Sequence, residues 1–179
     1  MQTDSLKETV ADEKLHLFSI YADFAASVRV KGAINKITKS VGKHWQLPLE
    51  MWKLDLLTSE SIKRMVADDA ANADVLIVAV SSFEQREREL IQWLESLRAA
   101  PSDYPGLLIG MLGDEENRTQ ELDWMVNQLL RCARKMNRDF IWHWMEENAD
   151  DCGWLVKSVE MLLARKNSFG LNEAAAATR

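Results

Sequence analysis

Asp74-Val-Leu-Ile-Val-Ala-Val80 is the stretch that decides the fold, because six consecutive apolar residues follow its aspartate. A strand with apolar side chains on both faces must be covered on both faces, as in the centre of a parallel sheet. Gly106-Leu-Leu-Ile-Gly-Met-Leu112 is a second run of this kind. Helical spacing over 84–100 separates the two runs. A helix between two strands is the connection that a parallel pair needs.

The same alternation of strand and helix continues on both sides of these two strands. Further strands are predicted at 15–21, 48–55 and 139–145, and further helices at 24–41, 59–72, 119–136 and 151–166. Pro48 favours an edge position for the strand that it opens. Strict alternation implies parallel pairing and right-handed crossovers. The expected fold class is α/β, a three-layer doubly wound sheet of five parallel strands in the order 2-1-3-4-5. The order 3-2-1-4-5 fits the same pattern.

The chain length suits one domain. Its 179 residues divide into a polar N-terminal tail at 1–14, an α/β domain at 15–166 and a C-terminal tail at 167–179 that we expect to be disordered. The net charge of -6 argues against nucleic acid and anionic membranes as general partners. No apolar run approaches the ~18 residues of a membrane span. Two cysteines without short spacing give neither a disulfide scaffold nor a zinc site, so we expect a cytoplasmic protein.

A ligand site in such a sheet lies beyond the carboxyl ends of the strands, where the strand order reverses. The predicted strand ends place four polar residues there as ligand-binding candidates: Asp23, Ser81, Ser82 and Asp114. Neither G-x-G-x-x-G after the first strand nor G-x-x-x-x-G-K-[ST] anywhere in the chain is present, which argues against a standard dinucleotide or ATP site. We expect no cofactor.

The acidic residues at this edge have two interpretations. Asp23, Glu84, Asp114 and Glu146 could converge on a divalent cation, since Mg²⁺ prefers oxygen ligands. Acidic residues at strand-to-helix turns are also ordinary helix caps, and capping is the interpretation that we favour. The serines lack the glycines of a nucleophile elbow. We therefore expect neither a metal site nor catalytic residues.

Two surface features favour contacts with another protein. The segment 24–44 carries five basic residues and no acidic one, and Arg29, Lys36 and Lys43 recur every seven residues and share a helical face. Such a face could dock an acidic partner. Seven tryptophans are many for this length. Core packing is the use that we favour for most of them, whereas an exposed tryptophan pair on an edge would mark an interface.

The layout over residues 15–166 resembles the receiver domain of bacterial response regulators and, more distantly, flavodoxin. Asp23 could match an acidic residue after the first receiver strand. The receiver's phosphorylated aspartate, its Ser or Thr and its Lys have no counterpart in Val80-Ser81-Ser82, Leu112-Gly113 and Trp144-Met145. The loop Ala22–Ser27 also differs from the Ser/Thr/Gly-rich phosphate loop of flavodoxin.

Two stretches, 52–57 and 73–79, also resemble a set of small bacterial proteins without an assigned activity. Together these resemblances imply a flavodoxin-like domain similar to a receiver without its phosphorylation site. We expect a non-catalytic interaction or signalling module that binds an unidentified protein or forms a homodimer. The alternative is a small enzyme, or a protein that binds a ligand or divalent cation at the carboxylate-rich edge of the sheet.

Overall fold

The computed structural model describes residues 13–41, 45–83, 85–99, 104–113, 119–144 and 153–176. Strands and helices alternate along this part of the chain, as the apolar periodicity predicts. The elements are β1 (Glu13–Lys14), β2 (Leu17–Tyr21), α1 (Phe24–Val41), β3 (Trp45–Gln46), β4 (Leu49–Lys53), the 3₁₀ helix η1 (Leu54–Thr58), α2 (Glu60–Asn72), β5 (Val75–Val80), α3 (Gln85–Ser96), β6 (Gly106–Leu112), α4 (Gln120–Lys135), β7 (Arg138–Trp144) and α5 (Gly153–Ala176).

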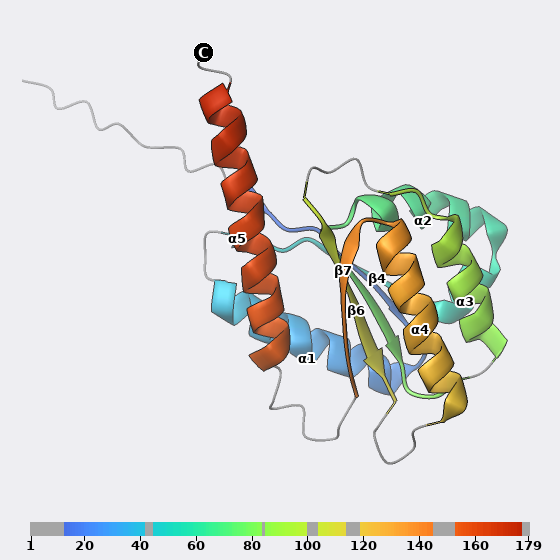
Figure 1. The fold of residues 1–179 in the computed structure, drawn as a ribbon. Coiled ribbons are helices and arrows are strands. Elements are labelled where there is room, and N and C mark those ends of the chain that lie inside the picture. Colours follow the sequence, from blue (N-terminus) through green and yellow to red (C-terminus); the bar gives the residue numbers. More distant parts are fainter. Residues whose placement is uncertain are drawn as a thin grey trace, which may run out of the picture.

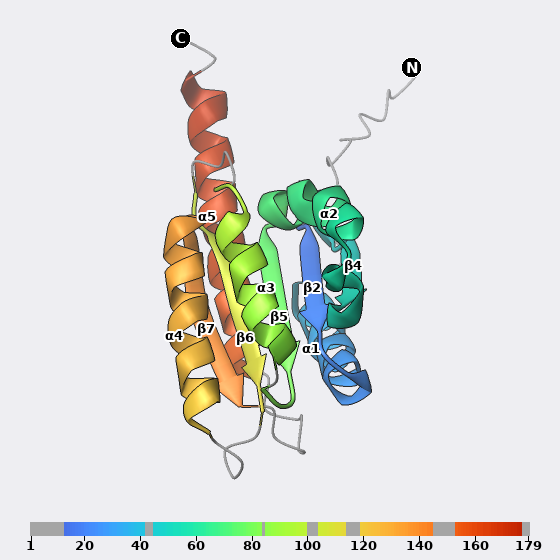
Figure 2. The same cartoon turned by 90° about the vertical axis from the view of Figure 1, so that its right-hand side faces the viewer.

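The main sheet, which Figure 1 shows nearly edge-on, has five parallel strands in the order β4-β2-β5-β6-β7, and this order can be followed in Figure 2. Counted in chain order within this sheet, that order is 2-1-3-4-5, so the predicted topology is confirmed and the order 3-2-1-4-5 is excluded. One feature of the pairing was not predicted. The two-residue strands β1 and β3 form a separate parallel pair, in which Glu13 lies opposite Trp45.

Helices cover both faces of the sheet and make three layers (Figure 2). On one face, Leu76 and Val78 of β5 pack in a core with side chains of α2, α3 and α4. On the other face, Val75 and Ile77 pack with side chains of α1 and α5. All six residues of β5 are buried. This explains the uninterrupted apolar run, since neighbouring side chains of a strand point to opposite faces.

Some predicted boundaries are wrong. The last helix does not end at Lys166 but continues to Ala176, through a segment whose alanines have the highest helix propensity. The helix predicted over 84–100 ends at Ser96. The strand predicted over 48–55 ends at Lys53, and the next residues turn into η1, where Leu54 and Leu57 are buried. Of the predicted N-terminal tail, only Glu13 and Lys14 are described, and they form β1.

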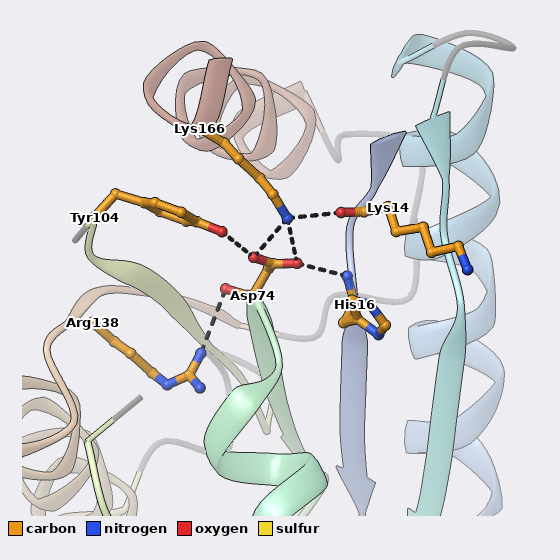
Figure 3. Close-up of polar contacts among 6 residues, drawn as sticks. All are labelled: Lys14, His16, Asp74, Tyr104, Arg138 and Lys166. Carbon is orange, nitrogen blue, oxygen red and sulfur yellow. Dashed lines mark hydrogen bonds and ion pairs between the residues drawn. The ribbon is translucent and has the colours of Figure 1, made fainter. Parts of the chain in front are cut away.

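A polar cluster at the amino end of the sheet ties the layers together (Figure 3). The buried carboxylate of Asp74 accepts hydrogen bonds from the backbone N–H of His16 at 2.8 Å and from the hydroxyl of Tyr104 at 2.6 Å. Lys166 Nζ of α5 lies 3.0 Å from both carboxylate oxygens and donates to the carbonyl of Lys14 at 2.7 Å. Strands β1, β2 and β5 and helix α5 are therefore joined at this point.

Arg138, at the start of β7, closes the end of α2 from within the protein. Its Nη2 donates to the carbonyl oxygens of Ala70 at 3.2 Å and Ala71 at 2.9 Å. A cation is favourable at the carboxyl end of a helix, where the carbonyl groups lack helical partners. Burial nevertheless lowers the pKa of Arg138 to about 10, an effect that the carboxylate of Asp74 partly opposes.

Candidate functional site

A cavity of about 550 Å³ lies beyond the carboxyl ends of β2 and β4. It lies at the point where the strand order reverses, which is where doubly wound sheets bind ligands. Its walls come from the ends of two strands, the start of α1, the first residues of η1, the loop after β5 and the start of α3. The lining residues are Tyr21, Ala22, Asp23, Phe24, Ser27, Lys53, Leu54, Asp55, Ser82, Arg86 and Glu87.

Asp23 lines this cavity and also caps α1. Its Oδ1 accepts a hydrogen bond of 2.8 Å from the backbone N–H of Ala26, and its carbonyl oxygen accepts one of 3.0 Å from the N–H of Ser27. This is the hydrogen-bonding pattern of a helix N-cap, so the predicted capping role is confirmed. The side chain therefore satisfies the first turn of α1 at the wall of the cavity.

Asp55 connects two cationic side chains of the cavity. Its Oδ2 lies 2.5 Å from Nζ of Lys53, and its Oδ1 is paired with Nη1 of Arg86. The hydrogen bond from Lys53 lowers the pKa of Asp55, and the positive charge of Arg86 acts in the same direction. All three side chains remain accessible to solvent, with 36% of Asp55, 46% of Lys53 and 54% of Arg86 exposed.

Two helices begin at the cavity, because Phe24 opens α1 and Arg86 is in the first turn of α3. Helix N-termini carry a partial positive charge and favour anions. The Phe24 side chain is 81% exposed, which is unusual for an apolar ring. The cavity thus combines cationic groups, an accessible aromatic ring and carboxylates. That set of groups suits an organic molecule with both a polar and an apolar part.

The structure brings together some of the predicted site residues but not all. Asp23 and Ser82 line the same cavity, whereas Ser81 does not. The Ser81 hydroxyl is buried and has no hydrogen-bond partner. Asp114 lies outside the described residues, as do two other carboxylates of the hypothetical cation site, Glu84 and Glu146. The part of the chain that the structure describes contains no group of three or more potential metal ligands.

The basic face of the first helix is only partly available. Arg29 and Lys36 of α1 are half-buried, and Lys43 lies outside the described residues. Lys36 already takes part in an interaction within the chain. Helices α1 and α5 pack on the same face of the sheet, where α5 crosses the later part of α1 (Figure 1), and the hydroxyl of Ser40 donates to Glu160 at 2.6 Å. The flank of α1 toward α5 is therefore already covered.

Two tryptophans are in contact on the edge strand β7. Trp142 and Trp144 of β7 make an edge-to-face contact with ring centroids 4.9 Å apart. Trp142 is 36% exposed, and its Cβ lies close to the backbone of Gly110 in the neighbouring strand. In the described part of the chain, β7 pairs only with β6, so its outer edge has no strand partner. Trp144 is half-buried and packs against the core that lies between the sheet and helices α2, α3 and α4, so the two rings do not form an exposed pair.

Sequence reasoning did not select the cationic residues of the cavity. Lys53 was assigned to the interior of a strand, although it is the last residue of β4. Arg86 is one of several charged residues in the Gln85–Glu89 stretch, and its sequence position gives no sign that it faces Asp55. These residues could have been found by looking for charged side chains near the end of the predicted strand, since Lys53 and Asp55 flank a turn at the carboxyl edge of the sheet.

No protein-family model and no curated protein sequence matches the chain. Among solved structures, it is similar to a short-chain flavodoxin associated with a non-canonical PDU bacterial microcompartment, with a TM-score of 0.54 and 12% identity over 84% of this chain and 99% of that one. Smu.1420 from Streptococcus mutans UA159 is also similar, with a TM-score of 0.44 and 10% identity over 82% and 97% of the two chains. The flavodoxin likeness shows that this chain has a flavodoxin-like fold, and it shows the fold alone. None of the described helices combines the length and apolar character that a bilayer crossing needs.

Proposed function

We propose that this protein binds a small organic molecule in the cavity beyond β2 and β4. The observation that carries the proposal is a cavity of about 550 Å³ at the switch point of the sheet. That volume is within the range of small-molecule sites, and the position is where this kind of sheet binds ligands. Lys53, Arg86 and Ser82 supply donors for polar groups of the ligand, and Phe24 supplies a flat apolar surface.

Binding is favoured over catalysis because of the side chains in the cavity. The described lining contains neither His nor Cys, so the residues able to move a proton near neutral pH are carboxylates. Asp23 is engaged with the first turn of α1, and Asp55 is paired with two cations that lower its pKa. The pairing of Asp55 favours a carboxylate that stays ionised, which suits recognition better than general acid catalysis.

The test is to block the cavity and follow the bound molecule. Untagged protein is incubated with a small-molecule extract of the expressing cells and examined by native mass spectrometry. Ser82→Trp places a large ring in the cavity, whereas Ser61→Trp adds the same ring at an exposed position of α2. We expect the wild type and Ser61→Trp to retain the same added mass and Ser82→Trp to lose it. Retention by Ser82→Trp would contradict the proposal.

A second candidate function is self-association through β7. It is supported by the outer edge of β7, which has no strand partner among the described residues, and by the partly exposed Trp142 on that strand. Edge strands offer free backbone groups, and two copies related by a two-fold axis could pair edge to edge. The protein would then be an interaction module that works as a homodimer. In this second proposal the module is similar to a receiver domain and is located in the cytoplasm.

Sedimentation velocity tests this second candidate. Trp142→Glu adds a charge at the edge, and Met65→Glu adds one at a more exposed apolar position on α2. Edge pairing predicts a dimer for the wild type and Met65→Glu and a monomer for Trp142→Glu. A wild-type monomer at high concentration, or the same mass for all three proteins, would exclude pairing through β7.

A further inference from the structure

We propose that Asp55 occupies the place of a ligand oxyanion, and that a phosphate ester group of the ligand displaces it to bind Lys53 and Arg86. This inference rests on the proposed function, because it concerns the same cavity. It adds the chemical class of the ligand, and it gives Asp55 a defined role as an internal competitor.

The geometry of the three charged groups supports the displacement. The two carboxylate oxygens of Asp55 are divided between the cations, one toward Lys53 at 2.5 Å and the other toward Arg86. Lys53 ends β4 and Arg86 begins α3, so the two cations approach the carboxylate from different elements. A phosphate group has the same ability to bridge them, and its additional oxygens match the remaining N–H donors of the guanidinium.

The charges of Lys53 and Arg86 favour a ligand with a dianionic group over a ligand with a single carboxylate. Lys53 and Arg86 together carry two positive charges, of which Asp55 neutralises one. A phosphate monoester carries about -1.5 to -2 at neutral pH, which matches both cations once Asp55 has moved away. The N-termini of α1 and α3 add favourable partial charge at the same cavity. Asp23 and the buried Glu87 also line the cavity and oppose an anion there, although Asp23 Oδ1 already accepts from the N–H of Ala26 and Glu87 is engaged in an interaction within the chain.

Displacement of Asp55 is sterically and energetically accessible. Its side chain is 36% exposed, and the two partners are about half exposed. Ion pairs as open to solvent as these contribute little to stability, so breaking them costs little. Asp55 also lies in the short 3₁₀ helix η1, a conformation with weaker hydrogen-bond geometry than an α-helix. Its carbonyl oxygen accepts from Thr58 Oγ1 at 2.8 Å, a contact that needs only the backbone of Asp55.

The experiment measures the affinity of inorganic phosphate by NMR titration of the full chain. Asp55→Asn keeps the shape of the side chain and removes the competing charge. We expect it to bind phosphate about tenfold more tightly than the wild type, since an anion near two cations no longer competes with a fixed carboxylate. Adding Arg86→Gln to this variant should reverse the gain.

The matched control is Asp68→Asn, which removes the same charge from an exposed pair with Arg98. An equal gain in Asp68→Asn would show a general charge effect and overturn the inference. So would unchanged or weaker phosphate binding by Asp55→Asn. If Asp55→Asn does not fold, the carboxyl ¹³C resonance of Asp55 in the wild type should shift on phosphate saturation, and a constant resonance would overturn the inference. A ligand that the wild type retains and Ser82→Trp loses, with no phosphate effect in Asp55→Asn, would overturn only the phosphate assignment and leave the proposed function standing.

Discussion

Lys166 Nζ lies 3.0 Å from both carboxylate oxygens of Asp74, although 92 residues separate them in sequence. The pair fixes α5, the last helix, to the residue before β5, the central strand. Asp74 is 8% exposed and Lys166 is 25% exposed. The carboxylate is therefore largely removed from water and depends on its partners for stabilisation.

Substitution of either partner should destabilise the fold by different amounts. Asp74→Ala removes the acceptor that Lys166, the Tyr104 hydroxyl and the N–H of His16 share, while Lys166 keeps only its bond to the carbonyl of Lys14, and we expect a loss of about 3 kcal/mol in the free energy of unfolding. Lys166→Met leaves Asp74 with its other two donors, so the expected loss is smaller, about 2 kcal/mol. Urea unfolding measures both.

The control for this prediction is Arg98→Met. Arg98 pairs with Asp68 at 3.4 Å, and the two side chains are 87% and 78% exposed. Its loss should change the unfolding free energy by less than about 1 kcal/mol. Equal losses for Lys166→Met and Arg98→Met would show that Lys166 does not anchor α5.

Substitution of Ser19 should not lower the free energy of unfolding, in contrast to the substitutions of Asp74 and Lys166. Ser19 is fully buried in β2, and its hydroxyl has no hydrogen-bond partner within the part of the chain that the structure describes. Because an unpaired buried hydroxyl costs free energy, Ser19→Ala should leave the protein equally stable or stabilise it by about 1 kcal/mol. Ser27→Ala is the comparison, since the buried Ser27 hydroxyl donates to the carbonyl of Phe24 at 2.8 Å. Thermal unfolding should show a loss for Ser27→Ala alone, and a clear loss for Ser19→Ala would be inconsistent with an unpaired hydroxyl.

Because the thiol of Cys132 is buried, we expect the protein to become less stable at high pH. Burial in α4 raises the pKa of this thiol from 9.0 to about 11, and Glu95 contributes in the same direction. Between these values the unfolded chain loses the proton while the folded chain keeps it, so the free energy of unfolding falls as pH rises. The contribution lost by pH 11 is about 2 kcal/mol. Urea unfolding at pH 8 and 10.5 should show a larger decrease for the wild type than for Cys132→Ala, and identical decreases would refute the assignment.

The fold could be predicted from the sequence because the pattern of apolar residues shows directly which side chains are buried. The run from Val75 to Val80 is apolar throughout because both faces of β5 are covered. Asp23 was predicted as a helix cap from its place between a strand and a helix, and a local hydrogen bond confirms it. Such features depend on neighbours in the chain, so a single sequence reveals them.

The site was less predictable because its charged groups meet through tertiary structure. Asp55 and Arg86 are 31 residues apart, and their contact depends on how η1 and α3 lie at the edge of the sheet. The predicted strand also includes Asp55, whereas β4 ends at Lys53. The prediction therefore missed the turn that brings the Asp55 side chain to Lys53. Ser81 was selected for its position after β5, but the backbone turns its hydroxyl into the protein and leaves Ser82 at the cavity.

The most direct test of ligand binding at the switch point is a ¹H–¹⁵N NMR map of the labelled protein with the small-molecule extract. We expect chemical-shift changes concentrated in the residues that line the cavity, which are Tyr21–Phe24, Ser27, Lys53–Asp55, Ser82, Arg86 and Glu87. Changes confined to β7, or to the exposed flank of α1, would contradict this expectation and place the functional surface elsewhere.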